Sequence, residues 1–399
     1  MIKYVLIAGI FSYPSGVAAS SRLRNLAYGF HKNNVNVKIV SLYQGPGSLR
    51  TGSNVDHIDG IEIKYHSLLN FRRETSNLIT RAFSRINFYF RLYSFVSFIF
   101  RNCNNSKDEL IFIYGRSFLF LNFLFIYKKL FKIQSKIVFD IVEPPRTKET
   151  KLEYLFHPFV WDSSLIYKHN FLRNFDGCTF ISYNLQKAFR DQVNKSVIVP
   201  SIRIGSSLQR RTLSLKTIKF GYLGALLDKD NPDLMFSFFK ALDTSGLTYE
   251  IHIIGRFNYF SAGRDWIKKF QNECFNSKLF VYDDPPNNRV EEILKDLDFL
   301  VLFRRQEYLQ LYTFPTRIVE LISLQKVIVT NSFGDVDFYF KNGYNCICIN
   351  DSNFNSLSYI FNYYKNLEEY NFLLKNSHDL LMSEFNPIFN SRKILDMFR

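Results

Sequence analysis

Short runs of uniformly apolar residues alternate with longer helical patterns along almost the whole of this 399-residue chain. In the first half these runs include KYVLIAGI at 3–10, VNVKIVSLY at 35–43 and SKIVFDIV at 135–142. A strand that is apolar on both faces is typical of a parallel sheet covered by helices on both sides. The alternation therefore predicts a doubly wound α/β domain, and it indicates a first β-strand at the N-terminus rather than a signal peptide.

The alternation stops at the polar stretch 201–217, which we interpret as a linker, and then begins again. IKFGYLGAL at 218–226, YEIHIIGRF at 249–257 and DFLVLF at 298–303 are the next predicted strands. A chain of this length fits two domains of ordinary size. We therefore expect two doubly wound domains that face a cleft, over residues 1–205 and 216–386, with ligands at the carboxyl ends of the strands.

The excess positive charge lies in the first half of the chain. The formal net charge is +15, and residues 1–200 hold 27 Lys and Arg against 13 Asp and Glu. This asymmetry predicts an anionic partner for one domain only: membrane lipid headgroups, a phosphorylated acceptor or a nucleic acid. The aromatic residues of this half have core-like spacing and no nucleic-acid reader motif is present, so we expect no nucleic-acid partner.

One segment, residues 77–102, combines aromatic and basic residues at helical spacing. Such a helix fits the surface of an anionic membrane. Alternatively, its aromatic residues pack on the first domain's sheet and its arginines are merely solvated. No run reaches the roughly 20 apolar residues of a membrane span, so we expect a cytoplasmic protein, peripheral at the inner face of the cell membrane. The residues of the two helical faces are Ile79, Phe83, Ile86 and Phe90, and Arg81, Arg85, Arg91 and Arg101.

A charged pair, Arg317 and Glu320, opens an otherwise apolar helix directly beyond the strand at 298–303. Pro315 suits the first helical turn, and the free N–H groups at such an end attract phosphate. Glu320 lies about 5 Å further along the axis, where its carboxylate can accept hydrogen bonds from two ribose hydroxyls. The alternative is an i,i+3 salt bridge between Arg317 and Glu320 on a solvated face.

Four further residues are candidates in the first half. Gly16 follows the first strand and is either close to a phosphate or a plain turn residue. Arg22, on the next helix, reaches a phosphate or an acceptor, or lies on a solvated face. Asp140 and Glu143 stand near the end of the strand at 135–142, where acceptor chemistry is expected. No His, Cys or Asp cluster has metal-ligand spacing, so we expect no metal.

Several landmarks follow one another in a fixed order. They are YPSGVAASSRLRNLAYGF, FDGCTFISYNLQKAF, FGYLGALLDKDNPDLMFSFFKAL and FPTRIVELISLQKVIVTNSFGDVDFYFKNGYNCICI. Together they resemble the retaining GT-B glycosyltransferases, the large group that includes glycogen synthase and many bacterial polysaccharide and lipid-linked sugar transferases. The resemblance spans essentially the whole chain, and its specificity lies in the order of the landmarks.

The resemblance implies two Rossmann-like domains, the first for the acceptor and the second for a nucleotide sugar, with a final helix at 387–399 packed back on the first. It implies a metal-independent transfer, with retention, from a nucleotide-diphosphate sugar to a glycan or lipid-linked acceptor in surface polysaccharide biosynthesis, without a cofactor. The residues carried over are Gly16, Lys229, Gly255, Pro315, Thr316, Arg317 and Glu320 for the donor, Glu143 and Arg317 for catalysis, and Arg22 and Asp140 for the acceptor.

Five positions depart from the family's pattern. Tyr312 replaces the first glutamate of a frequent pair, and Ala225 replaces the arginine of the Gly-Arg-Leu motif. Val142 stands where the family has a histidine near the acceptor, and Gln325 and Val327 stand where it has the glycine and the proline of Gly-x-Pro. These departures leave a second hypothesis open: a non-catalytic GT-B-like subunit that binds a glycan or a partner enzyme.

Overall fold

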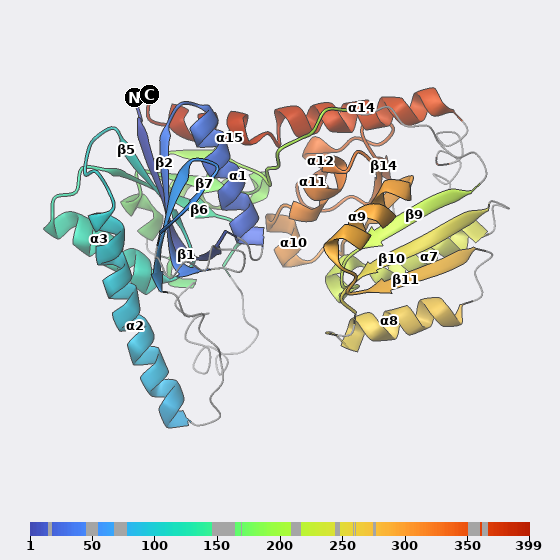
Figure 1. The fold of residues 1–399 in the computed structure, drawn as a ribbon, viewed down its shortest axis with the longest axis horizontal. Coiled ribbons are helices and arrows are strands. Elements are labelled where there is room, and N and C mark those ends of the chain that lie inside the picture. The colour runs from blue at the N-terminus through green and yellow to red at the C-terminus, as the bar shows by residue number, and fades with distance from the viewer. Residues whose placement is uncertain are drawn as a thin grey trace. The chain divides into compact units, whose positions relative to one another are not determined.

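The computed structural model divides the chain into two compact units (Figure 1). Unit 1 is Met1–Ile202 together with Asn386–Arg399, and unit 2 is Arg203–Phe385. The chain thus passes between the units twice, after Ile202 and after Phe385. The residues that the structure describes are 1–14, 18–44, 55–67, 78–145, 164–168, 170–208, 217–243, 248–257, 259, 261–273, 277–349, 360 and 366–399.

Unit 1 is built on an eight-stranded sheet in the order β3-β4-β2-β1-β5-β6-β7-β8. Its neighbouring strands pair in parallel, except that β3 is antiparallel to β4. The chain order reverses between β1 and β5, which makes their carboxyl ends a switch point. The strands are β1 (Tyr4–Tyr13), β2 (Asn36–Gln44), β3 (Val55–Ile58), β4 (Ile61–Ser67), β5 (Glu109–Tyr114), β6 (Lys136–Ile141), β7 (Gly177–Phe180) and β8 (Ser196–Ile198).

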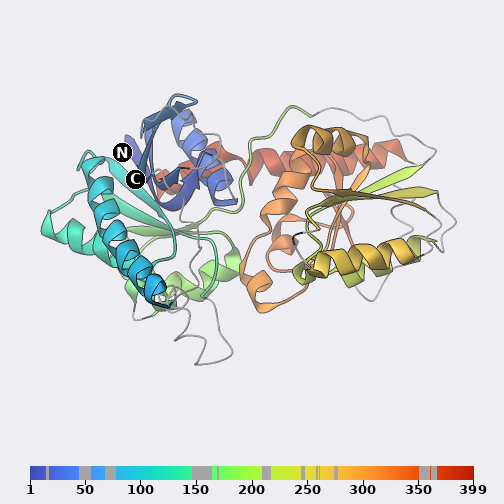
Figure 2. The same cartoon turned by 60° about the horizontal axis from the view of Figure 1, so that its bottom comes forward.

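Helices cover both faces of this sheet, with α1 and α15 on one side and α2 and α3 on the other (Figures 1 and 2). The final helix packs closely on α1, since a Cβ at Gly29 would collide with the Pro387 carbonyl. Asn33 adds a hydrogen bond from Nδ2 to the Ile388 carbonyl at 2.8 Å. The helices are α1 (Ala18–Lys32), α2 (Leu78–Arg101), α3 (Phe118–Leu130), α6 (Tyr183–Phe189) and α15 (Pro387–Asp396).

Unit 2 has a six-stranded parallel sheet in the order β11-β10-β9-β12-β13-β14. In the two views α8 and α14 lie on opposite sides of it (Figures 1 and 2). Its strands are β9 (Ile218–Leu223), β10 (Tyr249–Gly255), β11 (Lys278–Asp283), β12 (Phe299–Leu302), β13 (Val327–Thr330) and β14 (Ile347–Cys348). Its helices are α7 (Pro232–Asp243), α8 (Ser261–Asn272), α9 (Asn287–Asp296), α10 (Tyr308–Tyr312), α11 (Thr316–Ser323), α12 (Val336–Tyr339) and α14 (Leu367–Ser383).

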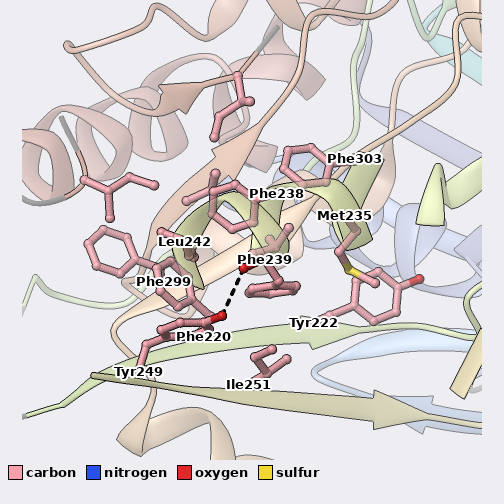
Figure 3. Close-up of a cluster of buried hydrophobic side chains, with 14 of the residues drawn as sticks. Phe220, Tyr222, Met235, Phe238, Phe239, Leu242, Tyr249, Ile251, Phe299 and Phe303 are labelled. Atoms are coloured by element: carbon pink, nitrogen blue, oxygen red, sulfur yellow. Dashed lines mark hydrogen bonds between the residues drawn. The ribbon is translucent and has the colours of Figure 1, made fainter. Parts of the chain in front are cut away.

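Aromatic side chains fix the position of β9 in the core of unit 2 (Figure 3). Phe220 stacks on Phe299 of β12 at 5.3 Å between ring centroids and meets Phe238 and Phe239 of α7 edge-on. The Tyr249 hydroxyl donates to the Phe239 carbonyl at 2.9 Å. Removing one such buried ring costs about 3–5 kcal/mol, so this cluster sets where β9 ends.

The structure confirms the predicted α/β class with two doubly wound units. The sequence did not predict the hairpin β3–β4, the helices α8, α10, α12 and α14 or the short strand β14. The hairpin turns at Asp59 and Gly60, which both have positive φ, as a two-residue turn between antiparallel strands requires. None of the described helices is both long enough and apolar enough to span a bilayer.

Candidate functional site

Glycines bring the carboxyl ends of β9 and β10 together in unit 2. The Gly224 N–H donates to the Ile254 carbonyl at 2.8 Å, and a Cβ at Gly255 would collide with the Gly224 carbonyl. A Cβ at Gly263 would likewise approach the Ala225 carbonyl. Gly255, a predicted donor residue, therefore lies at the ligand edge of the sheet, where the contact that it makes is with the turn after β9.

Two arginines converge on this edge. Arg304 follows β12, and its Nη1 donates to Asp230 in a nearly buried ion pair, with side chains 11% and 1% exposed. Arg317, in the first turn of α11, lies over the β9 turn, because a Cβ at Gly224 would collide with its Nη1. The carboxyl edge of the sheet thus presents two guanidinium groups, one of which lies directly over the backbone of Gly224, where there is no side chain.

Asp230 is the carboxylate of this cluster. Besides Arg304 it accepts a hydrogen bond from the Leu227 N–H at 3.0 Å. Burial raises the pKa of the Tyr222 hydroxyl, and the nearby Asp230 charge raises it further. Burial lowers the pKa of the Arg304 guanidinium; Asp230 opposes this effect, while Arg317 adds to it.

Arg317 has no such partner. It forms no hydrogen bond or ion pair with any residue that the structure describes. Within the group of Arg304, Arg317 and Asp230, one carboxylate therefore faces two cations. An anion is the ligand that this arrangement favours.

Helix α11 begins at Thr316, with Pro315 at the preceding position in extended conformation (φ −72°, ψ 103°). Pro315 thus lies one residue before the first helical turn in which the sequence placed it. No side chain caps this helix start. The first N–H groups of α11 are consequently not used by a capping side chain, as an anion site at a helix start requires.

Glu320 is one turn further along α11. Its Oε1 lies 3.7 Å from Nη1 of Arg203, and both side chains are about two-fifths exposed, at 42% and 40%. The predicted alternative, a salt bridge between Arg317 and Glu320, is absent from the ion pairs of the described residues. The carboxylate remains open to solvent, so a ligand can reach it.

Lys229, predicted to contact the donor, lies in the 3-10 turn η3 (Asp228–Asp230) beside the buried Asp230. Its carbonyl accepts a hydrogen bond from the Arg305 N–H at 3.3 Å, and the residue is exposed. The backbone is therefore tied to the edge, while donor contact by its side chain stays a prediction.

In unit 1, Arg22 and Asp140 form a buried bidentate pair with distances of 2.8 and 2.9 Å. Arg22 also donates to the carbonyls of Val199 and Pro200, and Thr179 donates to Asp140 at 2.6 Å. Their side chains are 6% and 0% exposed. The pair thus connects α1 to β6 inside unit 1, and contact of Arg22 or Asp140 with an acceptor stays a prediction.

Glu143 lies two residues beyond β6 and is accessible. Its Oε2 is 2.6 Å from Nη2 of Arg116, with side chains 45% and 27% exposed. The Tyr167 hydroxyl donates to the Glu143 carbonyl at 2.6 Å. Glu143 is thus accessible, while its contact with a ligand stays a prediction; Gly16 lies outside the described residues.

Sequence reasoning missed three charged residues: Arg116, Asp230 and Arg304. The signal for Arg304 was the pair of arginines directly after a buried strand, at the end where ligands bind. The pairing with Asp230 spans 74 residues and has no local signature. Among the described residues, no group of three or more His, Cys, Asp or Glu side chains is arranged to hold a metal ion.

Solved structures share this fold over almost the whole chain. One is titled trehalose-6-phosphate from E. coli bound with UDP-2-fluoro glucose, with a TM-score of 0.61, 11% identity and 99% of each chain covered. A sucrose-phosphate synthase from Thermosynechococcus elongatus has a TM-score of 0.62 at 11% identity, with 100% of this chain and 98% of that chain covered. A glycosyltransferase from Rickettsia africae gives 0.62 at 11% identity over 99% and 98%.

No family model and no curated protein matches the sequence. At about one identical residue in nine, the likeness to solved structures shows the fold alone. That fold agrees with the one implied by the order of landmarks in the sequence. The chain has a GT-B fold, with two Rossmann-like units.

Proposed function

We propose that the protein is a retaining glycosyltransferase that moves a sugar from a nucleotide-diphosphate donor to a membrane-associated or lipid-linked glycan acceptor in surface polysaccharide assembly. The observation that carries the proposal is the Arg317 guanidinium at the carboxyl edge of the unit 2 sheet, which pairs with none of the described residues and lies beside an uncapped helix start. The fold supports it, because a similar structure is titled as bound with UDP-2-fluoro glucose.

On the donor side, the diphosphate lies against Arg317 and the start of α11 at Pro315 and Thr316, with Lys229 nearby. The ribose hydroxyls donate to the Glu320 carboxylate. When the bond between the anomeric carbon and the phosphate oxygen breaks, its electron pair leaves with the diphosphate. Positive charge fixed at that place stabilises the transition state more than the ground state. Arg317 is thus the proposed catalytic group of unit 2.

On the acceptor side, Glu143 is the proposed catalytic carboxylate. It accepts a hydrogen bond from the acceptor hydroxyl and takes its proton, while the hydroxyl oxygen forms the new bond to the anomeric carbon on the face that the diphosphate leaves. Arg116 holds the carboxylate from one side, and Tyr167 holds its backbone. An exposed ion pair of this kind is worth about 0–1 kcal/mol, so an acceptor can rearrange it at little cost.

A surface on α2 and α3 supports the membrane-associated acceptor (Figure 1). Large apolar side chains are exposed on these two helices, whose course Figure 1 shows. The exposed fractions are 70% for Phe90, 71% for Leu130 and 58% for Phe131. The two helices are held together by aromatic pairs such as Phe100 on Tyr127, at 4.8 Å between ring centroids. We call the exposed set the α2–α3 face; it consists of Phe90, Tyr93, Ile126, Leu130 and Phe131. Three exposed basic residues belong to the same helices or follow them directly: Arg101, Lys129 and Lys132.

Both sequence interpretations of 77–102 have support in this region. Leu92, Phe95, Val96 and Ile99 are buried against the rest of unit 1, as the packing alternative expects. Phe90 and Tyr93 are exposed beside basic residues, which is the pattern of a peripheral membrane surface at anionic lipid. The side chains of 78–87, including Ile79, Phe83, Ile86, Arg81 and Arg85, lie outside the described ones.

The test is an incubation of the purified protein with a panel of nucleotide sugars and a lipid-linked glycan extract, with and without EDTA. We expect saturable donor binding, release of the nucleotide diphosphate and a sugar-extended lipid of unchanged anomeric configuration, with EDTA causing no loss. Failure to bind or cleave any donor of the panel would contradict the proposal.

The alternative, a non-catalytic glycan- or partner-binding subunit, is favoured by Ala225 and Tyr312, where the resembled motif has charged residues. Donor binding with slow hydrolysis in the absence of acceptor would exclude it. Glycan binding without any donor binding would support it. A thermal-shift screen of nucleotides separates the two first, since a ligand of the folded state raises the melting temperature.

A further inference from the structure

The ligand edge of unit 2 holds a guanidinium that neither the sequence motif nor the proposed donor contacts include. Arg304 is fixed there by its backbone as well as its side chain. Its N–H donates to Asn331 Oδ1 and its carbonyl accepts from Asn331 Nδ2, both at 2.9 Å. Asp230 holds Nη1 of the side chain. The other donors of this guanidinium make no hydrogen bond with the residues that the structure describes.

The residue at position 225 is the reason for expecting two arginines from other elements at this turn. The sequence has Ala225 directly after Gly224, where the resembled motif has an arginine. The guanidinium of Arg317 instead reaches Gly224 from α11, and it lies close enough to Arg304 to affect its charge equilibrium. The positive charge at this turn therefore comes from two other elements of unit 2, the segment after β12 and the start of α11.

The charges of Arg304, Arg317 and Asp230 do not balance within this group. Asp230 is already used by Arg304 and by the Leu227 N–H. The proximity of two guanidinium groups with one carboxylate costs free energy, and a bound anion with several oxygens removes that cost. Phosphate oxygens suit guanidinium groups especially well, because the planar fork donates two parallel hydrogen bonds.

We propose that Arg304 and Arg317 together bind the diphosphate of the donor, with Asp230 as the residue that positions Arg304. The two arginines supply the charge that residue 225 lacks. This inference rests on the proposed function, since it names the groups that hold the donor. Arg304 is a donor-binding residue by this assignment, and Asp230 acts through it.

The experiment measures binding of UDP, uridine and inorganic pyrophosphate by calorimetry to the full chain. Arg317→Gln removes one cation without breaking a hydrogen bond or ion pair to any described residue. Arg304→Met combined with Asp230→Asn removes the second cation without leaving a buried charge. Arg305→Gln is the matched control, because Arg305 is the next residue but pairs with Asp233 at the surface, with side chains 38% and 56% exposed.

We expect Arg317→Gln and the double variant each to weaken UDP and pyrophosphate binding about 10- to 100-fold, the effect of one charge-assisted contact. Uridine binding stays unchanged, and Arg305→Gln behaves as the unaltered protein. If the double variant does not fold, Arg304→Lys replaces it. That variant keeps the charge but loses the fork, so UDP binding weakens while uridine binding does not.

Wild-type affinity for UDP and pyrophosphate in the Arg304 variants would overturn the assignment, as would equal losses for uridine and UDP. If the unaltered protein binds neither UDP nor pyrophosphate, both the assignment and the proposed donor site are wrong. If the variants bind UDP normally and still transfer sugar, the assignment of Arg304 and Arg317 is wrong, while the proposed function stands. Pyrophosphate binding through both arginines without any sugar transfer refutes the enzyme and leaves the anion site.

Discussion

The carboxylate of Glu320 lies 3.7 Å from the guanidinium of Arg203, the first residue of unit 2 after the chain leaves unit 1. The N–H of Arg203 in turn donates to the carbonyl of Phe385, the last residue before the chain returns. The acid proposed to bind ribose thus lies beside Arg203, whose backbone is hydrogen-bonded to Phe385 at the second connection between the units. Because both partners are exposed, the pair contributes about 0–1 kcal/mol, and a ribose can displace it.

We predict that Glu320→Gln weakens nucleotide binding by about tenfold, since a carboxylate accepting from hydroxyls is worth about 1.5–3 kcal/mol and an amide much less. Calorimetry with UDP and with inorganic pyrophosphate measures this. Pyrophosphate, which has no ribose, should bind the variant normally.

Two controls sharpen this test. Arg203→Gln removes the competing partner of Glu320 and should leave UDP affinity equal or slightly higher. Glu307→Gln alters an exposed acid that precedes α10 and should change nothing. Unchanged UDP binding in Glu320→Gln would remove the ribose contact from the proposal.

The Arg22–Asp140 pair predicts a stability effect rather than a binding effect. Asp140→Asn leaves the Arg22 guanidinium buried without its charge partner, which costs about 3–5 kcal/mol. Urea unfolding followed by near-UV signals of unit 1 measures the loss. Arg116→Gln is the control, because it breaks a partly exposed pair and should cost no more than about 1 kcal/mol. A stable Asp140→Asn protein that binds the acceptor weakly would instead support a contact between Asp140 and the acceptor.

His66 of β4 makes the stability of unit 1 depend on pH. Burial lowers its pKa below the ordinary value, and Arg91 of α2 lowers it further. Its ring lies 5.5 Å from those of Phe95 and Phe98, and its Nε2 pairs with Ser94. The folded state thus prefers the neutral ring. The contribution of His66 is complete above the unfolded pKa of about 6.5 and is lost as the pH falls through the lower folded value.

We therefore expect the melting temperature to fall between about pH 6.5 and 5, and His66→Phe to remove part of that fall. His31, an exposed residue at the end of α1, provides the control variant His31→Phe. Identical pH profiles of the unaltered protein and His66→Phe would show that the ring titrates normally.

Most strands predicted from sequence, such as β1, β9 and β12, are buried on both faces and therefore largely apolar. The partly exposed β8 and β11 were predicted as well. The hairpin β3–β4 sits at an edge of the sheet and alternates apolar with polar residues, so the same criterion did not reveal it. Helix α10 has five residues, too few for a helical period to show.

The candidate site divides in the same way. Pro315, Arg317 and Glu320 could be placed from sequence, because a helix that follows a parallel strand starts at the carboxyl edge of the sheet. The ion-pair partners of the charged residues could not be predicted from sequence. Arg22 finds Asp140 at a separation of 118 residues, and Arg304 finds Asp230 at 74. Such pairings depend on how distant strands align, which no local pattern encodes.

The α2–α3 face predicts reversible binding to anionic lipid. Leu130 and Phe131 lie at the end of α3 between the exposed Lys129 and Lys132, so their side chains can enter the interface while the lysines contact headgroups. Leu130→Ser combined with Phe131→Ser should reduce sedimentation with vesicles containing phosphatidylserine by at least about threefold, because two large apolar contacts are worth several kcal/mol when fully buried.

The matched control is Tyr344→Ser combined with Phe372→Ser, which removes two exposed aromatic residues of unit 2. It should sediment like the unaltered protein. Raising the salt concentration should release the unaltered protein, since surface charge attraction is screened within about 8–10 Å at physiological ionic strength. Equal binding to neutral and anionic vesicles, or undiminished binding of the α3 variant, would contradict a membrane-associated acceptor. Unit 1 would then bind a dissolved acceptor.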